Sequence, residues 1–134
     1  MNERVAGELI RIAWLLLGKK TLTLYHGTSD VQAGKIKSKG LKNTTGSPKW
    51  YMLTSHKDDA IFHSETGSGK PVVVVFEIPI GDGERWDGFP YLWLPYKASG
   101  GFKGNWYAIN EKLLPEFVKK VEKVSDKDLK RVKG

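Results

Sequence analysis

The segment that most constrains the fold is Pro71–Pro79, which contains the run Val-Val-Val-Val-Phe-Glu-Ile. β-Branched and aromatic residues favour extended backbone, and this run is apolar at consecutive positions and not at alternate ones. A strand of that kind has to be covered on both faces, so we expect it in the interior of a sheet. A chain of 134 residues suits one domain with one core, and this sheet would organise it.

Other segments have the patterns of shorter elements. Apolar residues recur at helical spacing from Val5 to Leu16, between a capping Asn2 and Gly18, and predict an amphipathic helix. We expect strands over residues 21–25, 51–54, 91–94 and 106–109, helices over 30–37, 57–65 and 114–124 with Asp30 and Ser55 as caps of the first two, and a loop over 41–49. The predicted class is α+β, with an N-terminal helix (1–20) packed on the core, a main domain (21–124) and a loose, charged tail (125–134).

Composition excludes several kinds of protein. The chain has no cysteine, which excludes disulfides and thiolate metal sites. Its longest apolar run, residues 12–17, is far shorter than the ~20 residues that cross a membrane, and Glu3 and Glu8 oppose a signal peptide. We therefore expect a cytoplasmic protein without a membrane partner. The net charge of +7 is concentrated towards both ends of the chain. These ends would bind nucleic acid or an acidic protein; the alternative is that their charges form a solvated helix face.

The hexapeptide Leu24-Tyr25-His26-Gly27-Thr28-Ser29 is the strongest candidate for a functional motif. A strand delivers the His26 imidazole to a turn, and this ring can donate and accept hydrogen bonds. Gly27 lets the main chain approach a ligand closely, and two hydroxyls follow. The motif would hold a small polar ligand; the alternative is a histidine whose hydrogen bonds are satisfied within the fold.

Other apparent motifs carry less chemistry. The stretch Gly67-Ser68-Gly69-Lys70 lacks the first glycine of a phosphate-binding loop and has Pro71 where Ser or Thr is required, so we interpret it as a turn. His56 and His63 have no third ligand within reach, and we expect no metal. Asp58 and Asp59 are typical of the first turn of a helix.

Taken together, the order of motifs resembles that of the ADP-ribosyltransferase superfamily, namely the diphtheria-toxin-like and poly(ADP-ribose) polymerase branch and the tRNA 2′-phosphotransferases. The resemblance covers residues 22–122. Its first motif matches Leu24-Tyr25-His26-Gly27-Thr28, and its second matches Tyr51 with a following helix that carries Ala60. Its third falls in the segment from Asn105 to Glu111. It implies a split, mostly antiparallel sheet with flanking helices, and the N-terminal helix would be an addition to this fold. It also implies that NAD is the substrate and binds in the cleft between the two halves of the sheet.

The resemblance also implies roles for individual residues. Gly27 would pair through its backbone with the nicotinamide carboxamide, and His26 would hydrogen-bond the adenosine-side ribose with Thr28 and Ser29 nearby. Tyr51 would stack on the nicotinamide ring, while Tyr25 and Ala60 would support the pocket. Cleavage of the nicotinamide–ribose bond passes through an oxocarbenium-like state, which oriented hydroxyl groups and nearby negative charge stabilise.

This sequence departs from the family at the third motif, where the position of the usual glutamate falls on Asn105, six residues before Glu111. Either Glu111 is the carboxylate, or the enzyme works without one, or the pocket binds NAD without turnover. The leading hypothesis is transfer of ADP-ribose from NAD to a protein or nucleic acid, contacted by the aromatic loop 86–96 and the basic ends. The alternatives are a tRNA 2′-phosphotransferase-like activity and an inactive module that binds NAD or ADP-ribose.

Overall fold

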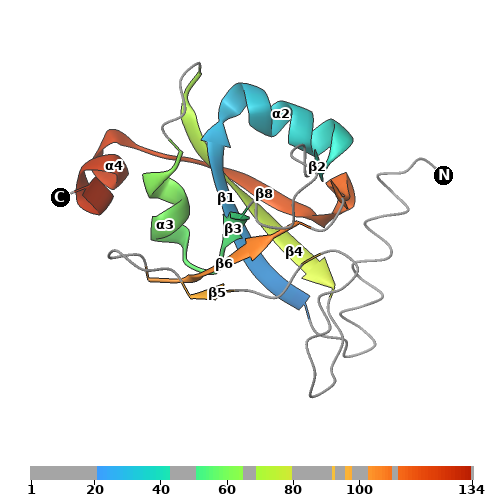
Figure 1. The fold of residues 1–134 in the computed structure, drawn as a ribbon. Coiled ribbons are helices and arrows are strands. Elements are labelled where there is room, and N and C mark those ends of the chain that lie inside the picture. Colours follow the sequence, from blue (N-terminus) through green and yellow to red (C-terminus); the bar gives the residue numbers. More distant parts are fainter. Residues whose placement is uncertain are drawn as a thin grey trace.

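The computed structural model describes residues 21–42, 51–64, 69–79, 92, 96–97, 103–109 and 112–133 (Figure 1). The helix expected over 2–18 lies outside the described residues, as do Glu111, most of the expected strand 91–94, and most of the aromatic loop 86–96.

The described residues form one six-stranded sheet, a two-stranded ribbon and a few helices. The sheet has the order β5-β6-β3-β1-β4-β8, and every neighbouring pair is antiparallel. Its strands are β1 (Thr21–Ser29), β3 (Tyr51–Thr54), β4 (Pro71–Pro79), β5 (Tyr96–Lys97), β6 (Asn105–Ala108) and β8 (Val118–Lys123). The ribbon pairs β2 (Leu41–Lys42) with β7 (Lys112–Leu113), and the helices are α2 (Asp30–Lys39), α3 (Lys57–Phe62), α4 (Asp126–Lys133) and the 3₁₀ turn η1 (Pro115–Phe117). This confirms the predicted α+β class with a mostly antiparallel sheet.

The valine-rich strand β4 is an interior strand that is covered on both faces, as predicted. It pairs with β1 along its length, from Thr21 opposite Pro79 to Ser29 opposite Pro71, and with β8 on its other edge. Its side chains enter two separate apolar clusters. Val72, Val74, Phe76 and Ile78 belong to one cluster, and Val73 and Val75 belong to the other.

Each cluster is closed by its own helices, which gives the molecule three layers. On one face of the sheet, α2 supplies Ala33 and Ile36, and the ribbon supplies Leu41 and Leu113. On the other face, α3 supplies Ala60 and Ile61, with residues of α4 packed against them. Figure 1 shows α2 on one side of the sheet and α3 and α4 on the other.

The helix predicted over 114–124 is wrong. The segment forms η1 and then strand β8, in which Val121 lies opposite Val74. Val118 and Val121 are three residues apart, which is a helical spacing; they share a face of β8 only because the register shifts between Val75 and Phe76. Strand formation is favoured by the backbone of β4, because the N–H and C=O groups on its outer edge are buried and need hydrogen-bond partners.

The tail over 125–134 is not loose, because residues 126–133 form α4. Ser125 caps it: the Asp128 N–H donates to the Ser125 hydroxyl at 3.1 Å, and the Ser125 N–H donates to the Asp128 carboxylate at 3.2 Å. Leu129 and Val132 of the helix pack against the cluster beneath α3. Capping and the partial burial of these two side chains order a segment for which the charge pattern alone predicted no structure.

Smaller differences concern the helix caps and the element bounds. β1 runs four residues further than expected, and Ser29, not Asp30, caps α2 by accepting from the Gln32 N–H at 3.2 Å. His56, not Ser55, caps α3 through its Nδ1, which accepts from the Asp58 N–H at 3.3 Å. α3 ends at Phe62, and the short strand β2 begins inside the expected loop 41–49.

Candidate functional site

The three predicted motifs lie on three neighbouring strands, β1, β3 and β6. Tyr25 of β1 is registered opposite Thr54 of β3, and Thr54 is opposite Trp106 of β6. Within the described residues that pair is the single registered one between β1 and β3, whereas β1 and β4 pair along nine residues each. Segments far apart in the chain thus meet in the middle of the sheet.

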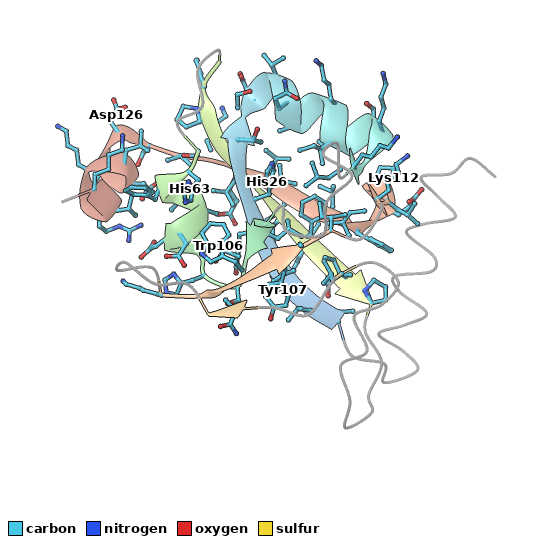
Figure 2. The ribbon with its side chains drawn as sticks, in the orientation of Figure 1. His26, His63, Trp106, Tyr107, Lys112 and Asp126 are labelled. Carbon is cyan, nitrogen blue, oxygen red and sulfur yellow. The ribbon has the colours of Figure 1, made fainter. Side chains whose placement is uncertain are left out.

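His26 lies on the face of the sheet that α2 covers. It is opposite Val74 and two residues beyond Leu24, both of which belong to the cluster under α2. Alternate residues of a strand share a face, so Thr28 lies there too. His26 is half-buried and Thr28 is buried; Figure 2 shows His26 below α2. The imidazole is thus held by the sheet while part of it remains accessible.

Asn105 and Tyr107 of β6 lie on the same face as His26. Tyr107 is part of the cluster under α2, and Asn105, two residues earlier in the strand, is exposed. Burial raises the pKa of the Tyr107 hydroxyl, and a hydrogen bond with the Asn105 side chain opposes that shift. An imidazole, an amide and a phenol are therefore presented by β1 and β6, with β3 between them.

Gly27 and Tyr25 lie on the opposite face, towards α3. A Cβ at Gly27 would stand 1.9 Å from the Ala60 carbonyl oxygen and 2.9 Å from the Ser64 nitrogen, so β1 and the helix approach each other backbone to backbone. Ala60 is buried in the α3 cluster, and Tyr25 packs against that cluster. The structure therefore does not bring the Tyr25 and Ala60 side chains to the face that carries His26.

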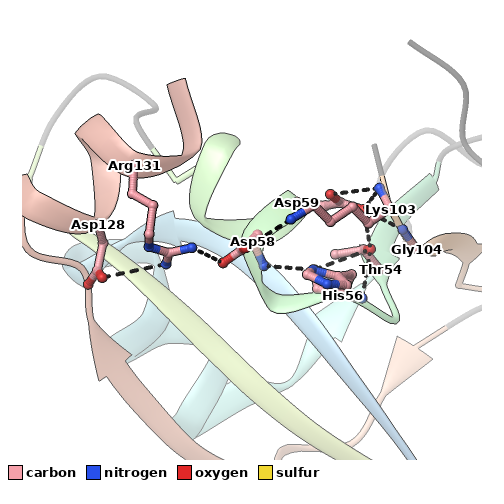
Figure 3. Close-up of polar contacts among 8 residues, drawn as sticks. All are labelled: Thr54, His56, Asp58, Asp59, Lys103, Gly104, Asp128 and Arg131. Atoms are coloured by element: carbon pink, nitrogen blue, oxygen red, sulfur yellow. Dashed lines mark hydrogen bonds and ion pairs between the residues drawn. The ribbon is translucent and has the colours of Figure 1, made fainter. Parts of the chain in front are cut away.

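The Asp59 carboxylate holds the start of β6 in place (Figure 3). Asp59 is buried in α3 and accepts hydrogen bonds from the N–H groups of Lys103, at 3.1 Å, and Gly104, at 2.8 Å. The Thr54 hydroxyl donates to the same carboxylate at 3.3 Å. Charge-assisted bonds of this kind are about twice as strong as neutral ones. Asp59 thus does more than begin a helix, because it fixes the residues that precede Asn105.

Ser55 completes this anchoring of Asn105. The Asn105 N–H donates to the Ser55 hydroxyl at 2.9 Å, and the Ser55 N–H donates to the Asn105 carbonyl at 3.0 Å. A side chain at Gly104 would meet His56 and Ser55 within 3 Å, so the turn requires a glycine there. Asn105 is accordingly exposed at its side chain but constrained at its backbone.

The remaining predicted site residues are placed in part. Ser29 is buried and uses its hydroxyl to cap α2. Tyr51 lies opposite Ala108 in the sheet, and its side chain is outside the described part of the structure. Glu111 is outside it as well. Sequence reasoning overlooked Tyr107 and the anchoring role of Asp59. The burial of Asp59 could have been suspected from its position, because it directly precedes the apolar pair Ala60-Ile61 in the sequence.

The two described histidines of the α3 region each make a contact within the fold. His56 caps α3, and His63 packs edge-to-face on Trp106, with ring centroids 5.1 Å apart (Figure 2). In the described ranges, no three His, Asp or Glu side chains gather closely enough to hold a metal ion. None of the described helices is long and apolar enough to cross a membrane.

No protein-family model, curated protein or solved structure gives a significant match to this chain.

Proposed function

We propose that the protein transfers ADP-ribose from NAD to a macromolecular acceptor, protein or nucleic acid, with release of nicotinamide. The observation that carries the proposal is the adjacency of β1, β3 and β6, the strands on which the three motifs stand. His26 and Asn105 share one face there, although 79 positions separate them in the chain. The sparse pairing between β1 and β3 also supports a sheet that divides into two halves at that point.

The polar groups of this face suit a nucleotide's ribose hydroxyls. The imidazole of His26 and the amide of Asn105 can each donate and accept, and the Tyr107 hydroxyl lies beside the amide. Asn105 is exposed and therefore reachable, while its backbone is fixed by Ser55 and its turn by Asp59. Such a fixed amide would orient a ribose hydroxyl as positive charge develops on the sugar.

The described strands of the site carry no carboxylate, since β1, β3 and β6 contain neither Asp nor Glu. This supports the tRNA 2′-phosphotransferase-like reaction as the second candidate, because that branch of the family works with a non-acidic third position. In both candidates His26 and Asn105 hold and orient the sugar. The two differ in the acceptor, which in the second is a 2′-phosphate on RNA.

The experiment is transfer of label from adenylate-labelled NAD to protein or RNA of a cell lysate. We expect His26→Ala to lower transfer by about 100-fold or more, because an oriented hydrogen bond is lost in the transition state. His63→Ala is the matched control, since this exposed histidine lies on the α3 face, and it should stay within about twofold of wild type. Thermal unfolding of both variants confirms that they fold.

The same assay separates the possibilities for the third motif. Asn105→Ala and Glu111→Ala, assayed in parallel, identify the position that transfer requires. Consumption of NAD only with 2′-phosphorylated RNA would favour the second candidate. Calorimetric binding of NAD without any turnover, or transfer by His26→Ala at the wild-type rate, would contradict the proposal.

A further inference from the structure

The positive charge of this protein is distributed unevenly within its described part. Residues 31–42 contain four lysines and no acidic residue. Three of them, Lys35, Lys37 and Lys39, are exposed along α2, and Lys42 follows on β2. The charge therefore collects towards the C-terminal end of α2 and on β2, in a segment that itself contains no acidic residue.

The ribbon β2-β7 adds to this charge. Lys42 is registered directly opposite Lys112, and both are exposed. Leu41 and Leu113 are buried in the core, so the lysines lie on the outer face of the ribbon. Like charges directly opposite each other in a ladder are unfavourable. The pairing therefore leaves two cations side by side where an anion would relieve their repulsion.

The ribbon is held tightly against the end of α2. Gly40 has φ 83° and ends the helix; a Cβ there would stand 2.2 Å from the Leu113 carbonyl oxygen and 3.0 Å from Cε of Lys112. Lys35 and Lys39 are one helical turn apart and share a side of α2. Lys35, Lys39, Lys42 and Lys112 together are called the α2 lysine surface below.

The lysines of this surface differ from those on the other face. There, Lys57 and Lys120 pair with Glu122, and Arg131 pairs with Asp58 at 2.8 Å. Within the described ranges, the four side chains of the α2 lysine surface form no ion pair with a carboxylate. The positive charge near the C-terminus is thus partly neutralised by carboxylates within the fold. The positive charge of the α2 lysine surface is not neutralised by any described carboxylate.

We propose that the α2 lysine surface binds the phosphate backbone of a nucleic acid. Interfaces with proteins have an apolar core, whereas the exposed uncharged residues of α2 are, apart from Val31 in its first turn, Gln32, Gly34 and Ser38. Nucleic-acid interfaces are polar and strongly positive, and lysine contacts phosphates as a point charge. This inference goes beyond the proposed function and does not depend on it, since the test measures binding and not catalysis.

The test is fluorescence anisotropy of the full chain with a labelled, single-stranded RNA of mixed sequence. The double variant Lys42→Gln/Lys112→Gln should bind about tenfold more weakly at physiological salt. The slope of log affinity against log salt should become less steep by about 1.4, at ~0.7 per lost phosphate contact. The matched control is Lys119→Gln/Lys123→Gln, which removes two exposed charges from β8 and should bind within about twofold of wild type.

Two further measurements make the test decisive. Lys42→Glu places opposite charges across the ribbon, so its melting temperature should not fall while its affinity for RNA does; a loss of binding is then not a loss of folding. Polyglutamate serves as the probe for an acidic protein and should be bound without dependence on Lys42 and Lys112. The proposal is overturned if both double variants lose affinity equally, if neither does, or if polyglutamate shows the same dependence on these lysines as RNA.

Discussion

At the scale of single residues, Gly27 is where β1 and α3 come closest. The glycine has no side chain to stand between the strand and the Ala60 carbonyl, and a Cβ would lie inside van der Waals contact with that oxygen. This clash is with backbone atoms and not with the end of a flexible side chain, so neither the strand nor the helix can shift at low cost. Gly27 therefore has a structural role in addition to the ligand contact that the resemblance implies.

We expect Gly27→Ala to destabilise the protein by about 3 kcal/mol or more, because it overpacks a buried contact between backbones. Gly34→Ala is the control. Gly34 lies within α2, and a Cβ added there would stand in open space, so alanine there should stabilise the protein by about 0.5–1 kcal/mol. Urea unfolding of the two variants measures both effects. A Gly27→Ala protein as stable as wild type would contradict the close approach of β1 and α3.

At the scale of elements, α4 depends on its docking to α3. An isolated helix of eight residues is marginal in water, so burial and pairing have to support it. Leu129 and Val132 supply the burial, and Arg131 donates to the Asp58 carboxylate at 2.8 Å. The ion pair with Arg131 holds the pKa of Asp58 below its ordinary value. Figure 3 shows this pair between the two helices.

The Arg131–Asp58 pair predicts a small, pH-dependent contribution to stability. Because Arg131 is exposed and its charge is screened by solvent, we expect Arg131→Gln to lower the free energy of unfolding only slightly at pH 7. The folded-state pKa of Asp58 is depressed, so the contribution is present above the unfolded pKa of about 4 and is lost as the pH falls through the folded value. The difference from wild type should therefore vanish well below pH ~4.

Urea unfolding at neutral and acid pH measures this difference. Lys130→Gln is the control, since it removes an exposed charge of the same helix that forms no ion pair with the described carboxylates, and it should leave stability unchanged at both pH values. An Arg131→Gln deficit of equal size at pH 7 and well below pH 4 would show that the guanidinium acts by packing and not through the Asp58 carboxylate.

At the scale of the whole molecule, the sheet separates two sides with different chemistry. The side of α2 carries His26, Asn105, Tyr107 and the α2 lysine surface. The side of α3 and α4 carries the charge pairs that join those helices to each other and to the sheet. Between them, β1 and β4 are paired along their full lengths and bury residues in both clusters.

This arrangement predicts the order of amide hydrogen exchange. Backbone amides of β1 and β4 should exchange slowest, because opening them requires both clusters to open. Amides of the two-residue strands β2, β5 and β7 should exchange fastest among the described strands, because few hydrogen bonds hold them. Exchange measured by NMR or mass spectrometry tests this order. Protection of β5 equal to that of β4 would contradict it.

The sequence predicted the elements whose residues allow one structure only. The valine run determined β4 and its burial on both faces, since exposing apolar side chains to water on either face of the strand is unfavourable. The helix expected over 30–37 extends to Lys39 and ends at Gly40, whose positive φ favours glycine. The strand over residues 51–54 was predicted with the bounds that the structure shows, because its residues favour extended backbone and are followed directly by a capped helix.

The tertiary structure decided everything that depends on a partner distant in sequence. Residues 118–123 became a strand because the free edge of β4 needed hydrogen bonds, and 126–133 became a helix because α3 offered Leu129 and Val132 an apolar surface. The same holds for the candidate site. The residue types of the site could be predicted from the sequence. Its arrangement could not: His26 and Asn105 share one face, Tyr25 and Ala60 lie on the other, and Asp59 anchors the turn before β6. This arrangement follows from the order and register of the strands, which the local sequence pattern does not encode.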